Sequence, residues 1–375
     1  MQTIKNNLRL LLVLCISVHA VESYAQKSAD SDILYTGTFS TRGSKGIYVF
    51  NFDRKSGKLT EVQTVESGTS PSFMDFSPDR KYLYSINGDR EGLVVAYKIN
   101  PENGFLMKIN EQPSKGGPAH ISVDPRGRFV YISNYGGGSL NVFPLNKDGS
   151  LAGASEIIKY EGSGPNLQRQ KAPHTHSAVP SKDGKFLYVS DLGTDKIMIY
   201  RVKKNGKLQP ANTPFFKSTP GSGPRHFAFH PSGKFAFSVN ELTSTITSLL
   251  VNRSTGALTS IEELNMFPDD FKGTTYAADV HVSPDGKFVY ASNRGHDSLV
   301  IFAIDQATGK LTLVGHESTG GKYPRNFMID SKGEFVLAAN QNSDNILIFK
   351  RDKSTGKLTR IGEYNVPAPV CIQQL

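Results

Sequence analysis

Acidic, basic and imidazole side chains interrupt a sequence that otherwise consists of repeated apolar strands and turns. Glu241 and Arg294 each follow an asparagine, and Arg225 and Arg325 each follow a proline. A glutamate or a histidine could take a proton from water or from a substrate. An arginine could hold a carboxylate or a phosphate through two hydrogen bonds, or stabilise a developing oxyanion. The plainer interpretation is a buried ion pair, so a site is favoured only if these residues converge with several histidines on one surface.

Other kinds of chemistry lack the residue spacing that they need. The HExxH and CxxC patterns of metal sites are absent from the sequence, and several histidines around one ring are the only remaining route to a metal. The sequence also has no G-x-S-x-G segment, which argues against a serine nucleophile. We therefore predict a site without a metal and without a cofactor.

The elements that position these residues are copies of one repeated unit. Each copy has a turn of Pro, Asp, Ser and Gly, a charged residue, and an aromatic and apolar strand, as in SPDRKYLYSIN (77–87) and SPDGKFVYASN (283–293). The seven copies of this strand end at Thr38, Asn87, Asn134, Asp191, Asn240, Asn293 and Asn340. A further strand precedes each copy, and an alternating strand, a turn and a short outer strand follow it, which predicts four antiparallel strands per unit. Seven units of this period predict an all-β fold, a seven-bladed β-propeller.

The two ends of the chain indicate how the ring closes. The first unit starts directly with its second strand, ILYTGT (33–38), and has no inner strand of its own. The last unit is complete, and residues 369–375 then repeat the Pro-x-x pattern that starts the other inner strands. We predict that the C-terminal strand joins the N-terminal blade, because this closure leaves no open sheet edge.

Two series of residues should meet at one mouth of the central channel. In an antiparallel blade, the inner strand starts where the second strand ends. The inner strands start with residues that include His120, His176, Arg225, His226, Asp279, His281, Arg325, Asn326 and Cys371. The residues after the second strands are Gly88, Tyr135, Leu192, Glu241, Arg294 and Gln341.

The recurrent Asn or Asp that ends the second strand is best explained as a turn cap. Glu241 and Arg294, by contrast, break the pattern of the repeat, as functional residues tend to do. The two longest insertions, 161–176 and 266–279, precede inner strands and therefore lie at the same face, where they could rim or cover a pocket.

Several segments give the chain a family resemblance: PHTHS (173–177), DLGTD (191–195), GPRHF (223–227), NEL (240–242), SNRGHD (292–297) and PVC (369–371). From about Tyr35 to the C-terminus the chain resembles the lactonase family of seven-bladed propellers. That family includes bacterial 6-phosphogluconolactonase and the fungal 3-carboxymuconate lactonizing enzyme. The resemblance implies a metal-independent reaction at a lactone ring.

The family's catalytic His, two Arg and Glu map onto His176, Arg225, Arg294 and Glu241. Thr175 stands where the family usually has proline, which leaves His174 as an alternative to His176. We expect the substrate-binding residues among His120, Asn134, Tyr135, His174, Asp191, His226, His281, His296, Arg325, Asn326 and Gln341.

Residues 1–25 have the pattern of a secretory signal peptide, with basic Lys5 and Arg9, a mostly apolar stretch over 8–18, and small residues at Ser23 and Ala25. We expect cleavage after Ala25, which leaves one domain, 26–375, in the periplasm or outside the cell. Only Cys371 then remains, so no disulfide is expected. No later stretch is apolar enough to cross a bilayer.

The formal charge of +9 comes from lysines scattered through the turns, without the basic and aromatic runs of a nucleic-acid-binding protein. We expect a monomer or weak dimer that acts on a small-molecule lactone or carboxylate. The leading hypothesis is hydrolysis of a sugar lactone, 6-phosphogluconolactone or an unphosphorylated analogue. Phosphorylated lactones form inside the cell, so export favours the unphosphorylated analogue or a lactone of aromatic degradation. The alternatives are a carboxymuconate cyclase and a non-enzymatic propeller that binds a ligand or glycan.

Overall fold

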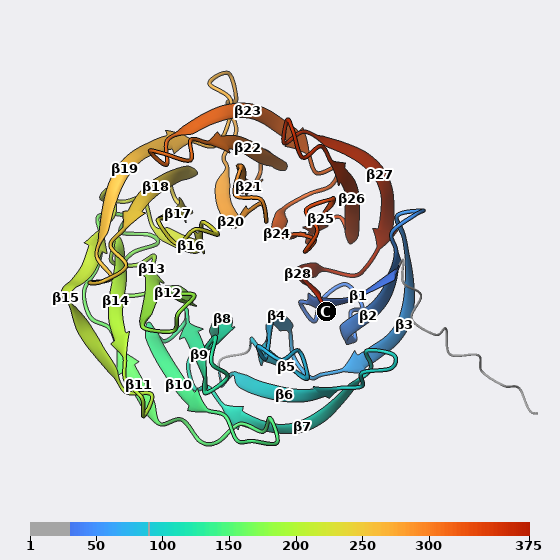
Figure 1. Cartoon of the computed structure of the whole chain (residues 1–375), viewed down its shortest axis with the longest axis horizontal. Coiled ribbons are helices and arrows are strands. Elements are labelled where there is room, and N and C mark those ends of the chain that lie inside the picture. The colour runs from blue at the N-terminus through green and yellow to red at the C-terminus, as the bar shows by residue number, and fades with distance from the viewer. Residues whose placement is uncertain (1–30, 89–90) are drawn as a thin grey trace, which may run out of the picture.

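The computed structural model describes residues 31–88 and 91–375, and within these ranges it contains strands and no helix. The strands form seven antiparallel sheets of four strands each. The sheets are arranged as blades around a central channel (Figure 1). The predicted seven-bladed propeller is therefore confirmed, whereas the signal peptide predicted over 1–25 lies outside the described residues. None of the described residues belongs to a helix that could span a membrane.

The four strands of a blade follow one another from the channel outwards. The innermost strands are β28 (Pro369–Gln374), β4 (Pro71–Phe76), β8 (Pro118–Val123), β12 (Thr175–Pro180), β16 (Pro224–Phe229), β20 (Tyr276–Val282) and β24 (Pro324–Ile329). The second strands are β1 (Ser31–Thr38), β5 (Tyr82–Asn87), β9 (Phe129–Asn134), β13 (Phe186–Asp191), β17 (Phe235–Asn240), β21 (Phe288–Arg294) and β25 (Phe335–Asn340). Blades 1 to 7 are numbered in the order of these second strands.

The third and outermost strands complete the blades. The third strands are β2 (Gly46–Asp53), β6 (Leu93–Ile99), β10 (Ser139–Pro144), β14 (Lys196–Val202), β18 (Thr245–Val251), β22 (Ser298–Ile304) and β26 (Asn345–Arg351). The outermost strands are β3 (Lys58–Glu66), β7 (Leu106–Pro113), β11 (Glu156–Lys159), β15 (Leu208–Lys217), β19 (Leu258–Asn265), β23 (Leu311–Ser318) and β27 (Leu358–Asn365). The second strands end at the predicted residue in six blades, and β21 continues by one residue to Arg294.

The ring closes in blade 1 as predicted. Strand β28 pairs with β1 in an antiparallel register that runs from Leu34 opposite Gln374 to Gly37 opposite Cys371. Figure 1 shows the C-terminus inside the ring, next to β1. A second closure lies beyond the end of β2, where Arg54 of blade 1 forms an ion pair of 2.7 Å with Asp330, which follows the innermost strand β24 of blade 7. Both contacts join segments from opposite ends of the chain.

Apolar packing between blades supplies the core. Seven buried clusters each join two neighbouring blades. Between blades 4 and 5, for example, the ring of Tyr188 stacks on Phe227 at a centroid distance of 5.3 Å. The Tyr188 hydroxyl also donates a hydrogen bond of 2.9 Å to the carbonyl of Gly256 in blade 5. Burial of each large side chain contributes roughly 1.5–3 kcal/mol, so these clusters hold neighbouring blades together.

The strand-terminal Asn and Asp residues form hydrogen bonds within the fold, and Asp191 makes the bond to the backbone two residues on that a turn cap predicts. Asn240 donates a hydrogen bond of 2.9 Å to Thr245 Oγ1 across the following turn. Asp191 accepts hydrogen bonds of 2.7 Å from the backbone N–H of His174 and of 3.0 Å from that of Gly193. These bonds fix the point where each second strand leaves the channel, and with it the residue that follows.

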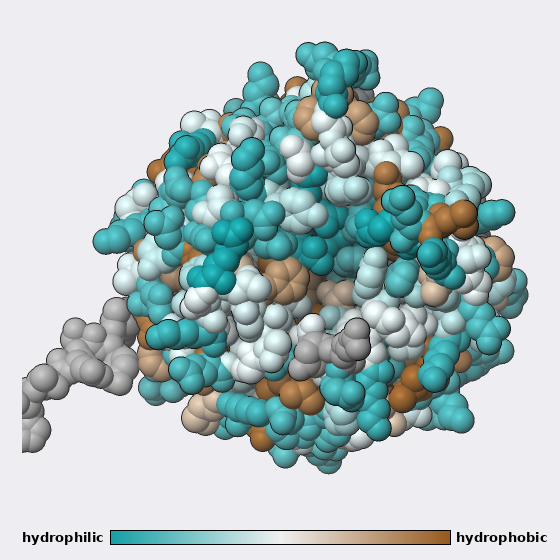
Figure 2. Space-filling view, turned by 180° about the vertical axis from the view of Figure 1, so that it is seen from behind, coloured by the Kyte–Doolittle hydropathy of each residue, from teal (hydrophilic) through white to brown (hydrophobic). Residues whose placement is uncertain are grey.

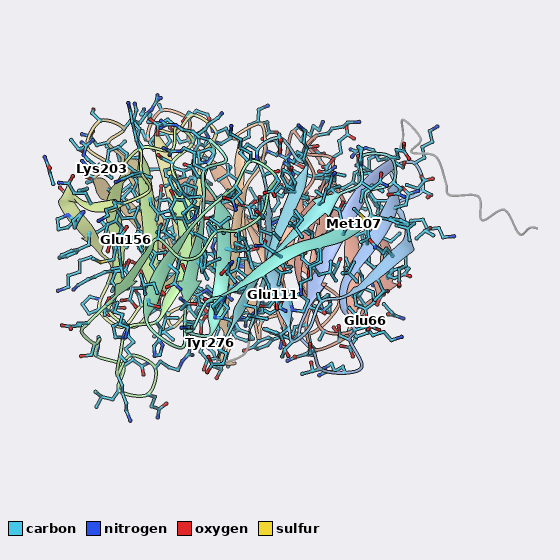
Figure 3. The ribbon with its side chains drawn as sticks, turned by 90° about the horizontal axis from the view of Figure 1, so that it is seen from below. Glu66, Met107, Glu111, Glu156, Lys203 and Tyr276 are labelled. Carbon is cyan, nitrogen blue, oxygen red and sulfur yellow. The ribbon has the colours of Figure 1, made fainter. Side chains whose placement is uncertain are left out.

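The disc has two distinct faces. In the side view of Figure 3, Tyr276 and Glu66 lie at one edge of the disc, and Lys203 lies at the opposite edge. Inner strands start, and second and outermost strands end, on the Tyr276 side. Figure 2 shows this face, where hydrophilic residues dominate and the surface is hollowed near the centre.

Candidate active site

A cavity of about 540 Å³ opens at the centre of the face where the inner strands start. This volume is within the range of small-molecule sites. The cavity is lined by Phe39, Ser72, Phe73, Gly88, Gly117, Pro118, Ala119, Tyr135, Gly136, Arg169, His176, Arg225, His226, Glu241, Tyr276, Arg294, Tyr323, Arg325 and Val370. Most of these residues belong to the two predicted series, the starts of inner strands and the residues that follow second strands.

A β-bulge near the start of each inner strand presents side chains to the cavity. In blade 5, Pro224 lies opposite Asn240 and His226 lies opposite Val239, so Arg225 is the extra residue between them. The same one-residue shift occurs in the other six blades. Six of these extra residues line the cavity, namely Ser72, Ala119, His176, Arg225, Arg325 and Val370. A bulge redirects a side chain out of the sheet's alternation, which explains why these positions point into the channel.

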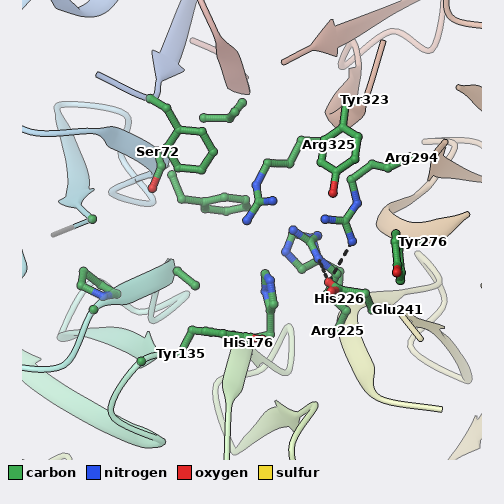
Figure 4. Close-up of a pocket in the computed structure, with 18 of the residues that line it drawn as sticks. Ser72, Tyr135, His176, Arg225, His226, Glu241, Tyr276, Arg294, Tyr323 and Arg325 are labelled. Carbon is green, nitrogen blue, oxygen red and sulfur yellow. Dashed lines mark hydrogen bonds and ion pairs between the residues drawn. The ribbon is translucent and has the colours of Figure 1, made fainter. Parts of the chain in front are cut away.

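Glu241 is the centre of the charged part of the cavity. Its Oε2 lies 2.9 Å from Arg225 Nε and 2.8 Å from Arg294 Nη2. Its Oε1 lies 2.6 Å from Arg169 Nη2. Figure 4 shows Glu241, Arg225 and Arg294 together at one side of the cavity. The ion pairing of the plainer interpretation is therefore present, with three guanidinium groups on one carboxylate.

The arginines keep this carboxylate ionised. Burial alone would raise the pKa of Glu241, because the side chain is only 6% exposed, but Arg294, Arg225 and Arg169 outweigh this effect and hold the pKa below its usual range. Glu241 is therefore a poor proton acceptor. Its physical role is to hold the arginines in place and to offset part of their charge.

The arginines retain donors for a ligand. Among the described residues, Arg294 Nε is buried and has no hydrogen-bond partner, while Arg294 Nη2 donates 2.8 Å to the carbonyl of Ala277. Arg325 has no ion-pair partner in the described part of the chain and lies over the ring of Phe39 at 5.2 Å. Burial and the nearby Arg294 lower the pKa of Arg325 to about 10, which leaves it charged near neutral pH. Four arginines and one carboxylate line the cavity, so the field inside favours an anion.

Two histidines of the cavity are neutral. Burial, Arg225 and His226 lower the pKa of His176 well below its usual value. Burial and Arg225 lower the pKa of His226 to about 4. The two rings pack edge to face at a centroid distance of 5.2 Å. Each ring is therefore unprotonated at neutral pH and keeps the lone pair of one ring nitrogen.

The structure places His176, and not His174, on the cavity surface. The ring of His174 stacks on Tyr135 at 4.5 Å, and its Nδ1 lies 2.9 Å from the Tyr135 carbonyl oxygen. His174 therefore supports the residue that lines the cavity. The geometry thus shows which of the two histidines lines the cavity, while the catalytic role of His176 stays a prediction.

The candidate residues fall into three groups by position. The cavity brings together His176, Arg225, Glu241, Arg294, Tyr135, His226 and Arg325. His120, His281 and Asn326 lie deeper along the channel, where His120 and His281 border a second cavity of about 320 Å³. Asn134, His174, Asp191, His296 and Gln341 do not line the first cavity. Asn134 and Asp191 hold turns, and His296 Nδ1 lies 2.6 Å from Ser298 Oγ.

The candidate list missed Arg169, Tyr276 and Tyr323. Arg169 and Tyr276 come from the two long insertions, which do reach the cavity as predicted. A basic residue in the insertion was the available signal for Arg169. Tyr323 precedes β24 and has a backbone φ of 65°, which is unusual for a tyrosine. No feature of the sequence predicts this conformation.

Among the described residues, no group of three or more His, Cys, Asp or Glu side chains is arranged to hold a metal ion. The side chains that line the cavity and can bind or exchange protons include arginine, histidine, tyrosine and one glutamate. These groups can bind an anion, stabilise an oxyanion and accept a proton.

Comparison of the sequence and of the structure with known proteins identifies the family that the chain resembles. The family model described as "Lactonase, 7-bladed beta-propeller" matches residues 33–374. The chain is 38% identical over 293 residues to the 6-phosphogluconolactonase of Bacillus subtilis (strain 168), which covers 78% of this chain and 83% of that protein. It is 40% identical over 304 residues to the 6-phosphogluconolactonase of Formosa agariphila, with 78% and 84% covered. The structure of the Pseudomonas aeruginosa periplasmic gluconolactonase aligns with a TM-score of 0.87 at 32% identity, covering 92% of this chain and 99% of that chain.

Proposed function

The chain belongs to the lactonase family of seven-bladed β-propellers, and from this membership we propose that it hydrolyses a sugar lactone in the cavity at the channel mouth. One observation carries the proposal. A buried glutamate orients three arginines beside two neutral histidines in a cavity of about 540 Å³. Hydrolysis of a lactone requires both an anion-stabilising group and a proton acceptor.

The free donors fit the charge that develops in the reaction. When water attacks the ring carbonyl, the carbonyl oxygen becomes an oxyanion. Arg294 Nε, which has no partner among the described residues, and Arg325 supply donors for it. A neutral histidine of the cavity takes one proton from the water. Collapse of the intermediate breaks the bond to the ring oxygen, which leaves as a hydroxyl after it receives that proton. The product is then a carboxylic acid, which releases its remaining acidic proton to solvent and becomes a carboxylate.

Glu241 acts on the arginines and not on the water. The sequence left both Glu241 and a histidine as proton acceptors, but a carboxylate that binds three guanidinium groups holds its charge too firmly to accept a proton. The opening of the lactone produces a hydroxy acid. Its carboxylate suits the same arginines, so the product also interacts with the site.

For the substrate, we propose an unphosphorylated sugar lactone and an exported enzyme. The support is the secretory pattern of residues 1–25 and the likeness to a protein named as a periplasmic gluconolactonase. Relatives named 6-phosphogluconolactonase keep the phosphorylated lactone as the comparison substrate. If the enzyme opens both the phosphorylated and the unphosphorylated lactone, we expect the two substrates to differ mainly in KM.

The test is a lactone-opening assay with purified protein, corrected for spontaneous hydrolysis. Glucono-1,5-lactone, 6-phosphoglucono-1,5-lactone and a carboxymuconate serve as substrates, with wild type and Arg294→Ala compared on each. We expect wild type to open glucono-1,5-lactone and Arg294→Ala to lose about 10²–10³ in kcat, the cost of removing one oxyanion donor. Equal rates for the two proteins would refute the assignment, and turnover of the muconate alone would favour the cyclase.

A further inference from the structure

His226 has a partner that the reaction so far leaves unused. Its Nδ1 lies 2.6 Å from Asp279 Oδ1, and both side chains are less than 10% exposed. A carboxylate accepts hydrogen bonds and cannot donate them, so the proton of the neutral ring lies on Nδ1. The other nitrogen, Nε2, is buried and has no hydrogen-bond partner among the described residues. The ring therefore presents an unpaired acceptor.

Asp279 is fixed in its position by several donors. Its Oδ2 accepts a hydrogen bond of 2.6 Å from Asn326 Nδ2 and lies 2.9 Å from His281 Nε2. Its Oδ1 also accepts 2.9 Å from the backbone N–H of Val280. Burial alone would raise the pKa of Asp279, but the histidines His281 and His226 hold the pKa well below its usual value. The carboxylate is thus ionised, and it cannot rotate away from His226.

His176 has no comparable support. Its Nδ1 is buried without a hydrogen-bond partner among the described residues, and Arg225, His226, Arg325 and Arg294 all oppose a positive charge on it. A proton on His176 would add to the positive charge of the cavity with no carboxylate behind the ring. Burial, Arg225 and His281 also oppose a proton on His226, but Asp279, whose Oδ1 lies 2.6 Å from Nδ1, offsets part of this effect. A carboxylate behind an imidazole both selects the tautomer and stabilises the imidazolium.

We propose that His226, oriented by Asp279, is the base that takes the proton from the attacking water, and that His176 lines the cavity without exchanging this proton. The proposal rests on the lactonase function above. His226 Nε2 accepts the proton, the imidazolium forms beside Asp279, and the same proton passes to the departing ring oxygen, so the ring ends neutral. Figure 4 shows His176 and His226 on the floor of the same space that Arg325 and Arg294 border.

The first test replaces Asp279 with asparagine. An asparagine that donates to Nδ1 would move the ring proton to Nε2 and remove the acceptor, so we expect Asp279→Asn to lower kcat by about 10²–10⁴ with KM changed less than about threefold. Asp75→Asn is the matched control. Asp75 is a partly buried aspartate that also borders the second cavity. It accepts hydrogen bonds from the backbone N–H groups of Val123 and Phe76, and it has no histidine partner among the described residues.

The second test keeps the proposal falsifiable if Asp279→Asn fails to fold. His226→Gly leaves a space the size of an imidazole ring, and added imidazole should restore activity at least tenfold. The same addition should restore much less in the double variant His226→Gly, Asp279→Ala. His176→Gln, measured beside them, should change KM more than kcat, because His176 lines the cavity and exchanges no proton in this proposal.

The outcomes separate this proposal from the lactonase function. If wild type opens no lactone, the proposed function fails. If wild type is active and Asp279→Asn turns over as fast as Asp75→Asn, the base is not His226. Loss of kcat in His176→Gln, together with no imidazole rescue of His226→Gly, would likewise overturn the proposal and transfer the role to His176.

Discussion

Replacement of Glu241 by glutamine tests the electrostatic account of the cavity most directly. Glutamine keeps the size of the side chain and removes its charge. Arg225, Arg294 and Arg169 would then lose their shared counter-ion, and two of the three are almost completely buried, with side chains 2% and 4% exposed. The substitution leaves uncompensated positive charge in a low-dielectric space.

The expected cost follows from this burial. Breaking a buried ion pair by removing one partner destabilises a protein by about 3–5 kcal/mol. The exposed pair of Lys108 and Glu111 provides the matched control, because its N–O distance of 2.6 Å equals that of Arg169 and Glu241 while its side chains are 53% and 43% exposed. Exposed pairs contribute about 0–1 kcal/mol. We therefore expect Glu111→Gln to be nearly neutral at the same ion-pair distance.

The assay is equilibrium urea unfolding of wild type, Glu241→Gln and Glu111→Gln at several pH values. An unfolded glutamate has a pKa of about 4.3, and the folded pKa of Glu241 lies below it. A lowered folded pKa gives stability that is fully present above the unfolded value and is lost as the pH falls toward the folded value. The difference in free energy of unfolding between wild type and Glu241→Gln should thus be constant above about pH 6 and shrink below about pH 4.

Added gluconate should narrow the same gap at neutral pH. An anion that binds the native state stabilises it in proportion to RT ln(1 + [L]/Kd), and it would replace part of the missing charge. The reasoning is refuted if Glu241→Gln unfolds at the same urea concentration as Glu111→Gln near pH 7. If the difference in free energy of unfolding instead grew toward low pH, the inference that folding lowers the pKa of Glu241 would be refuted.

The remaining predictions concern closure, the thiol and the insertion. Arg54→Ala should cost on the order of 3 kcal/mol in urea unfolding without changing kcat, because it leaves the buried Asp330 without its ion pair. Cys371 is completely buried, and burial raises the pKa of its thiol. A thiol reagent should therefore label it only after denaturation. Rapid labelling of the native protein would contradict the closing position of β28. Arg169→Ala should lower kcat/KM about tenfold, the effect of one charge-assisted hydrogen bond of about 1.5 kcal/mol, and an unchanged value would show that its contact with Glu241 is not needed.

The framework was predictable because its signals are local and repeated. The turn and strand phrase that ends at Asn87 or Asn240 occurs within about ten residues, and its recurrence fixed the number of blades and the ends of the second strands. The incomplete first unit and the proline at 369 likewise predicted the closing strand β28. Strand pairing in a propeller follows sequence order, so local signals are enough.

The exact membership of the cavity was not predictable in the same way. Alternation in a strand assigns side chains to two faces, but the bulge at Arg225 shifts this assignment by one residue. His174 and His176 are two residues apart, so alternation places them alike, yet only His176 reaches the cavity. Arg169 arrives from a loop, whose path depends on tertiary contacts such as its bond to Tyr135 at 3.2 Å. The path of this loop leaves no local pattern, whereas the bulge recurs directly after the proline of five inner strands.

The same bulges explain how a ring of similar blades produces a cavity whose charged side chains lie on one side. All seven blades offer an equivalent position beside the channel, but blades 4 to 7 fill it, or the position after the second strand, with His176, Arg225, Glu241, Arg294 and Arg325. Blades 1 to 3 supply Phe39, Ser72, Phe73, Gly88, Ala119, Tyr135 and Val370. Figure 4 shows the charged groups on one side of the cavity and Ser72 on the other. A lactone bound with its carbonyl toward the arginines would therefore place the rest of its ring against mostly uncharged, smaller or aromatic residues. Different side chains at equivalent positions of the repeat are enough to set this orientation, without any change of fold.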